Sequence, residues 1–236
     1  MLAPAHERDA LVQFQEEGHA YSVMGRADFV SVTTYIGRLF AAFEPDLVIE
    51  KMMAGKNWPK SKYFGMDAAG IKQVWKNAAD LGTLLHADIE HFYKGEPYEN
   101  TSPEFLQFLE FDKNKTDLKP YRSEWRVFNE EVGIVGTIDM VFERPDGTVD
   151  IYDWKRTNQI TKKSPWGNAL HPLLAHLPDT NYWHYALQLN LYQYLLESKY
   201  GLKVSGRYLV CMHPERAFYE LVPIVELQAE VREILK

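Results

Sequence analysis

Apolar residues in the first part of the chain recur at two different spacings. Over residues 11–35 they alternate loosely with polar residues and are interrupted by glycines, which predicts short strands or a hairpin. Over residues 67–92 they recur at intervals of three and four, the spacing of an amphipathic helix. A shorter helix is predicted to begin at Pro45 and to end near Met53, and the stretch 56–64 is predicted to be a loop.

The spacing changes in the middle of the chain. Ser102 and Pro103 are a capping residue and a first-turn proline, so they predict a helix that ends near Asp112. Beyond it, apolar and polar residues alternate, which predicts three strands in an antiparallel meander. The last two strands are joined by a turn at 144–147, where proline presets φ and glycine accepts positive φ. The three strands span 121–128, 134–142 and 149–154.

A long segment without periodicity follows, at about 156–181, and is predicted to be a loop. Residues 182–199 have helical spacing, and Gly201 is placed to end that helix. This order predicts an α/β (α+β mixed) fold in which helices flank a central mixed β-sheet. We expect residues 1–236 to form one domain, with about 1–66 as an N-terminal elaboration. The chain closes with two predicted strands and a helix, at 207–213, 217–222 and 224–236.

The composition is that of an ordinary globular protein, with 46% hydrophobic and 25% charged residues. The sequence has one cysteine, Cys211, which excludes an internal disulfide framework and a four-cysteine zinc or iron–sulfur site. No apolar run is long enough to cross a membrane, and no signal peptide is visible behind Met1. The expected compartment is therefore intracellular.

The net charge of −7 argues against a nucleic-acid partner, because phosphate binding depends on Lys and Arg. A sum over the whole chain hides local patches, however, and carboxylates at a metal site make it more negative until the metal binds. Two groups of basic residues stand close together along the chain. They are Lys51, Lys56, Lys60 and Lys62, and then Lys155, Arg156, Lys162 and Lys163.

Candidate chemistry lies on the three predicted central strands, where side chains alternate between the two faces of the sheet. On the third strand this places Asp153 and Lys155 on one face and Tyr152 and Trp154 on the other. On the second strand, Asp139 points away from an apolar face that the even-numbered positions form. Those positions are Ile134, Gly136, Ile138, Met140 and Phe142.

Glu124 lies on the first of these strands, on the face that also carries Arg122 and Arg126. If the strands are adjacent and in register, Glu124 meets the two aspartates and the lysine at one patch. Carboxylates in apolar segments destabilise the fold by several kcal/mol unless they are paired. A divalent cation would offset that energy, and hard oxygen ligands suit Mg²⁺ or Mn²⁺. The alternative is a set of surface ion pairs on a solvated sheet face.

Two segments carry a resemblance to a known family. They are Gly133-Ile134-Val135-Gly136-Thr137-Ile138-Asp139 and Ile151-Tyr152-Asp153-Trp154-Lys155-Arg156-Thr157. Together they resemble the PD-(D/E)XK nucleases of the RecB and Cas4-like branch, which includes the mitochondrial genome-maintenance exonucleases. The resemblance extends from about Val30 to Val210. It implies a restriction-endonuclease-like core that hydrolyses DNA phosphodiester bonds with one or two Mg²⁺ or Mn²⁺ ions, here without an iron–sulfur cluster.

Two further segments agree with the family pattern. Gly82-Thr83-Leu84-Leu85-His86 resembles the upstream helix whose histidine helps to bind metal, and Gln188-Leu189-Asn190-Leu191-Tyr192 resembles the Gln-x-x-x-Tyr motif. Without the family pattern, a lone helical histidine is more often a packed or surface residue. Glu90 lies one turn after His86 and could hold the imidazole, although a surface pair is an equal alternative.

The resemblance assigns roles to these positions. The metal ligands it implies are His86, Asp139, Asp153 and the Trp154 carbonyl. Lys155 is expected to assist the attacking water or to stabilise charge on the phosphate. The residues expected to support the site or touch the substrate are Glu124, Gln188 and Tyr192.

The resemblance also favours an exonuclease that acts on single-stranded DNA or DNA ends, in repair, recombination or replication. Basic residues with an aromatic one in the 156–181 loop would suit single-stranded DNA, although a plain surface excursion is an equal alternative. No phosphate-binding loop of a helicase occurs, so a helicase or recombination partner would be another chain. Two alternatives stay open: a non-catalytic DNA-binding or assembly module, and an RNA-directed nuclease. The loop residues in question are Lys162, Lys163, Trp166, His171 and His176.

Overall fold

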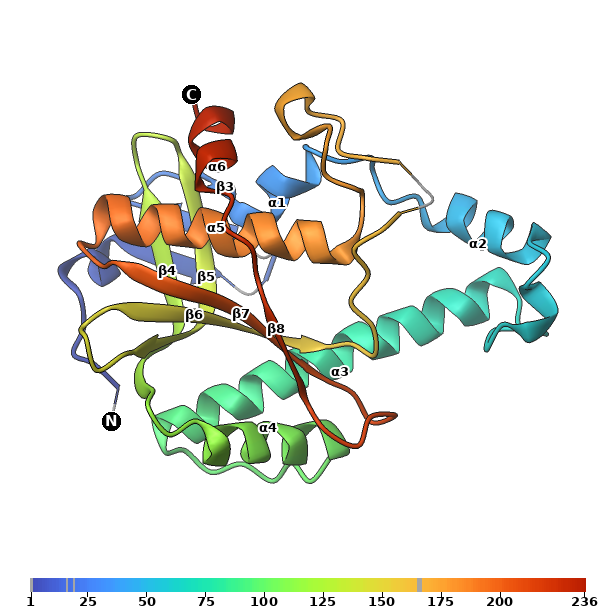
Figure 1. The fold of residues 1–236 in the computed structure, drawn as a ribbon, viewed down its shortest axis with the longest axis horizontal. Coiled ribbons are helices and arrows are strands. Elements are labelled where there is room, and N and C mark those ends of the chain that lie inside the picture. The colour runs from blue at the N-terminus through green and yellow to red at the C-terminus, as the bar shows by residue number, and fades with distance from the viewer. Residues whose placement is uncertain (1, 16, 19, 165–166) are drawn as a thin grey trace.

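The strands of this computed structural model form a small hairpin and a six-stranded mixed sheet (Figure 1). The structure describes residues 2–15, 17–18, 20–164 and 167–236. The hairpin pairs β1 with β2, and the large sheet has the order β3–β5–β6–β7–β8, with β4 paired to β5. The strands are β1 (Val12–Gln15), β2 (Ala20–Val23), β3 (Val30–Ser31), β4 (Lys119–Asn129), β5 (Ile134–Glu143), β6 (Val149–Arg156), β7 (Val204–Met212) and β8 (Glu220–Pro223).

Helices cover both faces of the large sheet, with α5 on one side and α3 and α4 on the other (Figure 1). The predicted α/β class with a central mixed sheet is therefore confirmed. The helices are α1 (Val32–Gly37), α2 (Pro45–Ala54), α3 (Ala68–Lys94), α4 (Pro103–Asn114), α5 (Asn181–Lys199) and α6 (Gln228–Ile234). Short 3-10 helices lie at Glu7–Leu11, Trp58–Lys60 and Pro172–Leu174.

Some predicted boundaries were wrong. Residues 32–35 continue the predicted strand pattern but form α1, because the Ser31 side chain accepts a hydrogen bond from Thr34 N and caps a helix there. The predicted loop at 56–64 contains a short 3-10 helix at Trp58–Lys60, with Pro59 as its second residue. The closing helix begins at Gln228 rather than at residue 224, and the strand before it occupies 220–223 rather than 217–222.

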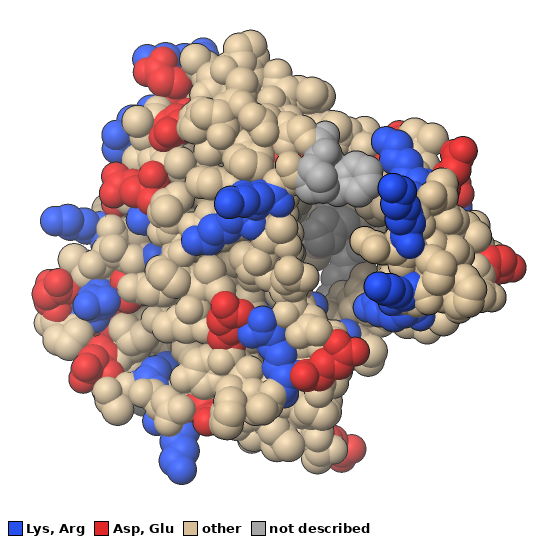
Figure 2. Space-filling view, turned by 45° about the vertical axis from the view of Figure 1, so that its right-hand side comes forward, with Lys and Arg blue, Asp and Glu red and all other residues tan. Residues whose placement is uncertain are grey.

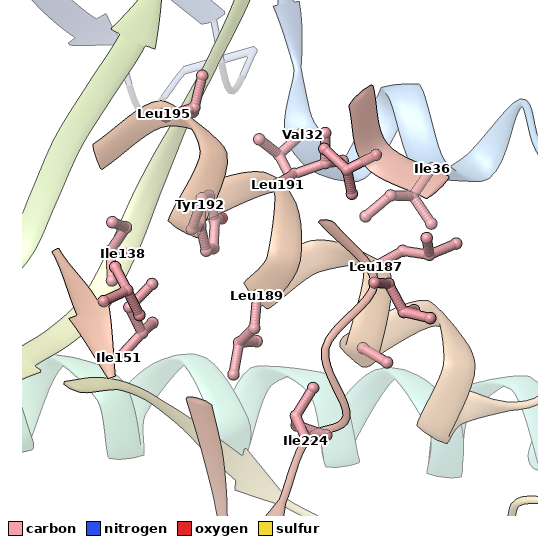
Figure 3. Close-up of a cluster of buried hydrophobic side chains, with 14 of the residues drawn as sticks. Val32, Ile36, Ile138, Ile151, Leu187, Leu189, Leu191, Tyr192, Leu195 and Ile224 are labelled. Atoms are coloured by element: carbon pink, nitrogen blue, oxygen red, sulfur yellow. The ribbon is translucent and has the colours of Figure 1, made fainter. Parts of the chain in front are cut away.

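Two hydrophobic clusters hold the three layers together. One lies between the sheet and α5, where Ile138 and Ile151 face Leu189 and Tyr192 (Figure 3). The other lies on the opposite face, where Trp154 packs with the aromatic side chains of α4. Since β6 is buried on both faces, residues that reach the end of this strand are held in a fixed environment.

The central strands form the predicted meander, but β5 and β6 separate at one end, and we call this point the fork. β5 and β6 pair from Glu143↔Val149 to Met140↔Tyr152, and the pairing stops there. The next positions along the two strands are Asp139 and Asp153, so the carboxylates lie where the strands begin to separate. β6 stays paired with β7 over its whole length. The fork therefore creates a polar gap inside an otherwise continuous sheet.

The predicted face of β5 is interrupted at the same point. Ile134 and Ile138 pack beneath α5, but Met140 and Phe142 pack in the opposite cluster against α3 and α4. The even-numbered positions thus do not share one face, contrary to the prediction. The residue opposite Asp139 on β4 is Glu124, whose φ of 46° is left-handed. A residue in that conformation bends its strand and breaks the regular alternation.

The long segment between β6 and α5 is more than a surface excursion. It has no α-helix in its described residues, as predicted, yet Ala169, Leu174 and Leu177 are buried in the cluster beneath α5. Leu170 N also donates to Leu39 O at 2.8 Å. Trp166, which the sequence singled out, lies outside the described residues.

Basic side chains gather on the part of the molecule that projects around α2 (Figure 2). Lys51, Lys56, Lys60 and Lys62 are all exposed, so this predicted group forms a basic surface. The second predicted group differs, because Lys155 and Arg156 are each held by a buried carboxylate. None of the helices in the described part of the chain combines the length and apolarity needed to cross a membrane.

Candidate active site

Three potential metal ligands from three elements meet beside the fork. His86 on α3, Glu124 on β4 and Asp139 on β5 each place a ligand atom within 4.8 Å of the others. Glu124 lies opposite Asp139 because Ser123 pairs with Met140 and Trp125 with Ile138. Sequence reasoning placed Glu124 in a supporting role, whereas its carboxylate belongs to this cluster.

The hydrogen bond of His86 fixes which ring nitrogen faces the carboxylates. Nε2 lies 2.9 Å from the carbonyl oxygen of Trp154, which can only accept, so Nε2 carries the proton. Nδ1 lies 3.5 Å from Asp139 Oδ2 and 3.9 Å from Glu124 Oε1. In the neutral ring Nδ1 carries a lone pair that faces the carboxylates of Glu124 and Asp139. A cation placed between these three groups could accept all of them as ligands.

Asp139 ties the two arms of the fork together. Its Oδ2 accepts a hydrogen bond of 2.8 Å from Trp154 N, and the residue is 9% exposed. Where β5 and β6 no longer pair through their backbones, a side chain thus satisfies the amide of β6. The carboxylate is held rigidly by this bond, which is the kind of positioning that a ligand needs.

Glu124 is held in an electrostatically unfavourable place. Burial, together with the carboxylates of Asp139 and Glu90, raises the pKa of Glu124 from 4.5 to about 9. Of the two alternatives for Glu90, the structure shows the surface pair: its Oε1 lies 2.5 Å from Lys94 Nζ, and the residue also lines the cleft beside the His86 ring. A cation between these carboxylates would remove the repulsion that raises the pKa of Glu124.

Asp153 and Lys155 form a buried pair on the α5 side of β6. Lys155 Nζ lies 2.6 Å from Asp153 Oδ2 and 4.8 Å from the centre of the Tyr185 ring. Burial raises the pKa of Asp153 to about 6, since it outweighs the opposing effect of the lysine. Burial also disfavours the charge on Lys155, but the carboxylates of Asp153 and Asp139 outweigh it and raise the lysine pKa. The pair with Asp153 therefore favours the charged form of Lys155.

The structure separates the four ligands that were predicted from the sequence into two groups. Asp153 is not part of the His86, Glu124 and Asp139 cluster, because its carboxylate pairs with Lys155. The Trp154 carbonyl accepts from His86 instead of standing open. Both lie next to the cluster, and their assignment to the metal stays a prediction.

Gln188 and Tyr192 extend the site along α5. They are one turn apart, the Gln188 amide nitrogen lies 3.4 Å from the Tyr192 hydroxyl, and both face the cleft. Tyr192 fits against β5 because Gly136 has no side chain: a Cβ there would lie 2.8 Å from the Tyr192 ring and 3.1 Å from Val32.

Replacing Gly136 with alanine is therefore expected to push Tyr192 out of place. The strain should lower the free energy of unfolding by about 1–3 kcal/mol, as overpacking does in other cores. Urea denaturation measures this, with Gly37→Ala as the control, because a Cβ at Gly37 meets nothing within 4 Å. Equal stability of Gly136→Ala and the native protein would contradict this packing argument.

A cleft of about 350 Å³ contains most of these groups. Its walls also include residues that sequence reasoning did not assign to the site, among them Phe14, Tyr21 and Arg126. Tyr185 was missed as well, although it lies one turn before Leu189 on the helix that carries the predicted Gln188. Another cavity, of about 310 Å³, lies by the 144–147 turn and is lined by none of the candidate site residues.

Comparison with known proteins gives one family match. A model described as the PD-(D/E)XK nuclease superfamily matches residues 99–235, a stretch that includes the site residues of β4, β5, β6 and α5 but not His86. No curated protein matches the chain.

Two solved structures are similar at low identity. The crystal structure of SSO0001 is 19% identical, covers 88% of this chain and 73% of its own, and has a TM-score of 0.36. A protein from Eubacterium rectale, whose name suggests an exonuclease role, is 12% identical over 65% of this chain and 63% of its own, with a TM-score of 0.38.

Proposed function

The chain belongs to the PD-(D/E)XK nuclease superfamily, and from that premise we propose that it is a metal-dependent nuclease that hydrolyses phosphodiester bonds in DNA. The observation that carries the proposal is the convergence of His86, Glu124 and Asp139 beside the buried Asp153–Lys155 pair. A sheet that merely binds DNA has no need for three acidic groups and a lysine in one fork.

The residues present fit a divalent cation. Two carboxylates and one imidazole nitrogen with a lone pair lie close together, and burial together with the charge of Asp139 raises the pKa of Glu124. Carboxylate oxygens suit Mg²⁺ and Mn²⁺, and a neutral histidine is a common metal ligand. His86, Glu124 and Asp139 would hold one ion, and Asp153 would join them if its carboxylate exchanged Lys155 for the ion. A bound cation would supply an activated water and positive charge for the phosphate.

The chain's own residues would position the substrate around that centre. Lys155 is a half-buried cation that lines the cleft, so it would donate to a phosphate oxygen and stabilise the charge that develops on it. The Trp154 carbonyl keeps His86 in the required tautomer. Gln188 and Tyr192 would offer an amide and a hydroxyl to the substrate or to the site.

The finer assignments rest on the resemblance of the motifs. We propose a member of the RecB and Cas4-like branch that acts as an exonuclease on single-stranded DNA or DNA ends, in repair, recombination or replication. A motor, if one takes part, would be another chain. Cleavage of end-labelled single-stranded DNA, duplex DNA and RNA with Mg²⁺ or Mn²⁺ tests this directly. Absence of both Mn²⁺ binding and cleavage would favour a non-catalytic assembly module, and preference for RNA would favour the RNA-directed alternative.

Divalent cations are expected to stabilise the protein more as the pH rises. The pKa of Glu124 is higher in the folded state than its ordinary 4.5, so the folded state binds more protons and stability without metal falls between pH 4.5 and about 9. A cation competes with that proton and favours the carboxylate. Thermal unfolding at pH 5.5 and pH 8.5, with and without Mn²⁺, measures the effect.

The matched variant for that experiment is Glu124→Gln, which removes the titrating group and keeps the size of the side chain. It should weaken both the pH dependence and the stabilisation by Mn²⁺. An Mn²⁺ effect that is the same at both pH values in the native protein would be evidence against a metal held by Glu124.

A further inference from the structure

The cleft has an aromatic wall that the metal centre does not use. Phe14 on β1 and Tyr21 on β2 lie side by side across the hairpin, with ring centres 4.7 Å apart. Both are half-buried and line the same cleft as His86 and Asp139. The wall is made of two adjacent rings that are only partly covered.

The wall is fixed to the strand that carries the metal ligand. The Tyr21 hydroxyl lies 2.9 Å from Thr137 Oγ1. Thr137 stands two residues before Asp139 on β5, so this contact sets the distance between the rings and the ligand cluster. This contact therefore holds the β1–β2 hairpin at one side of the cleft.

The guanidinium group of Arg126 lies next to this aromatic wall. Arg126 is exposed, and its guanidinium carbon lies 5.6 Å from the centre of the Phe14 ring. Arg126 stands two residues after Glu124 on β4 and lines the cleft with it. An arginine next to aromatic rings combines a phosphate contact with a stacking surface, which is the pairing that nucleic-acid sites use.

We propose that Phe14, Tyr21 and Arg126 form a nucleotide subsite that takes the unpaired base and the phosphate next to the scissile bond. The inference rests on the proposed nuclease function and names the side chains that would select a single strand. A base can stack on a protein ring only where a neighbouring base does not cover its face, so the subsite selects a single strand at this position. Arg126 holds the phosphate of the same nucleotide.

The test is a double-mutant cycle that combines the removal of one side chain, that of Phe14, with the removal of one base from the oligonucleotide. Cleavage of a single-stranded oligonucleotide is compared with cleavage of oligonucleotides that carry one abasic nucleotide, placed at each position in turn. Phe14→Leu should raise KM about tenfold on the intact strand, the loss expected for one stacked base. One abasic position should cause a similar loss in the native protein and little further loss in Phe14→Leu. Phe14→Tyr, which keeps a ring, should restore most of the affinity.

Two exposed residues away from the cleft serve as controls. Phe218 is 68% exposed in the turn before β8, and Arg232 is exposed on α6. Phe218→Leu and Arg232→Gln should cleave both oligonucleotides as the native protein does, whereas Arg126→Gln should weaken binding of the intact and the abasic strand alike. Additive losses for Phe14→Leu and every abasic position, or no loss at all, would overturn the subsite.

A failure of the nuclease function would be seen separately. Hydrolysis of a small p-nitrophenyl phosphodiester by the native protein reports the metal chemistry without any stacked base. If that reaction and DNA cleavage are both absent, the proposed function fails. The same cycle measured by fluorescence anisotropy with labelled strands and Ca²⁺ still decides whether Phe14 stacks a base.

Discussion

Replacing Asp139 with asparagine should lower the rate of DNA cleavage by about a thousandfold, at the upper end of what one positioned electrostatic group contributes. The substitution keeps the length of the side chain, and its Oδ1 can still accept from Trp154 N, which Asp139 binds at 2.8 Å. The fork should therefore stay folded while the site loses one negative charge. The loss should come from weaker metal binding and a less stabilised phosphate, and not from unfolding.

The measurement is single-turnover cleavage at several Mn²⁺ concentrations, with Mn²⁺ affinity measured in parallel. Asp146→Asn is the matched control, because Asp146 is an exposed carboxylate in the turn at the other end of the same strands. The control should retain the native rate. Native activity in Asp139→Asn would show that the cluster is not the catalytic centre.

Replacing Lys155 with methionine is expected to affect both activity and stability. Methionine fills similar space but removes the cation, so cleavage should fall about a hundredfold or more for the loss of one group that stabilises developing charge. Asp153 is 1% exposed and would be left without its partner. Breaking a buried ion pair in this way should lower the free energy of unfolding by about 3–5 kcal/mol.

A double variant separates these two effects. Asp153→Asn combined with Lys155→Met removes both charges and should recover most of the stability, because neither charge is then buried alone. Cleavage should stay as low as in the single variant. Urea denaturation and cleavage assays on the same preparations provide the comparison. Recovery of activity along with stability would mean that Lys155 has a purely structural role.

The regular spacing of apolar residues made much of the fold predictable. The helix with apolar residues at every third and fourth position extends over Ala68–Lys94, and the alternating segments form the meander β4–β5–β6. The turn at 144–147 set the hairpin register, which pairs Met140 with Tyr152 and leaves Asp139 and Asp153 as the next residues of the two strands. These features depend on neighbours in the sequence, so a single chain contains the information for them.

Irregular geometry was not predictable in the same way. Glu124 has a left-handed backbone, and no residue type other than glycine signals that conformation reliably. The bond from His86 to the Trp154 carbonyl joins residues 68 positions apart, so no local pattern encodes it. Phe14 and Tyr21 reach the cleft because a separate hairpin folds against β5, which is a tertiary contact.

The fork between β5 and β6 limits which sequences this position can accept. At Asp139 one carboxylate replaces a missing backbone partner of Trp154 and also faces His86. A glutamate would carry the same charge, but its extra methylene would move the oxygens past the amide. The position therefore requires the length of aspartate as well as its charge. Asp139→Glu would keep the charge but lose the hydrogen bond to Trp154 N.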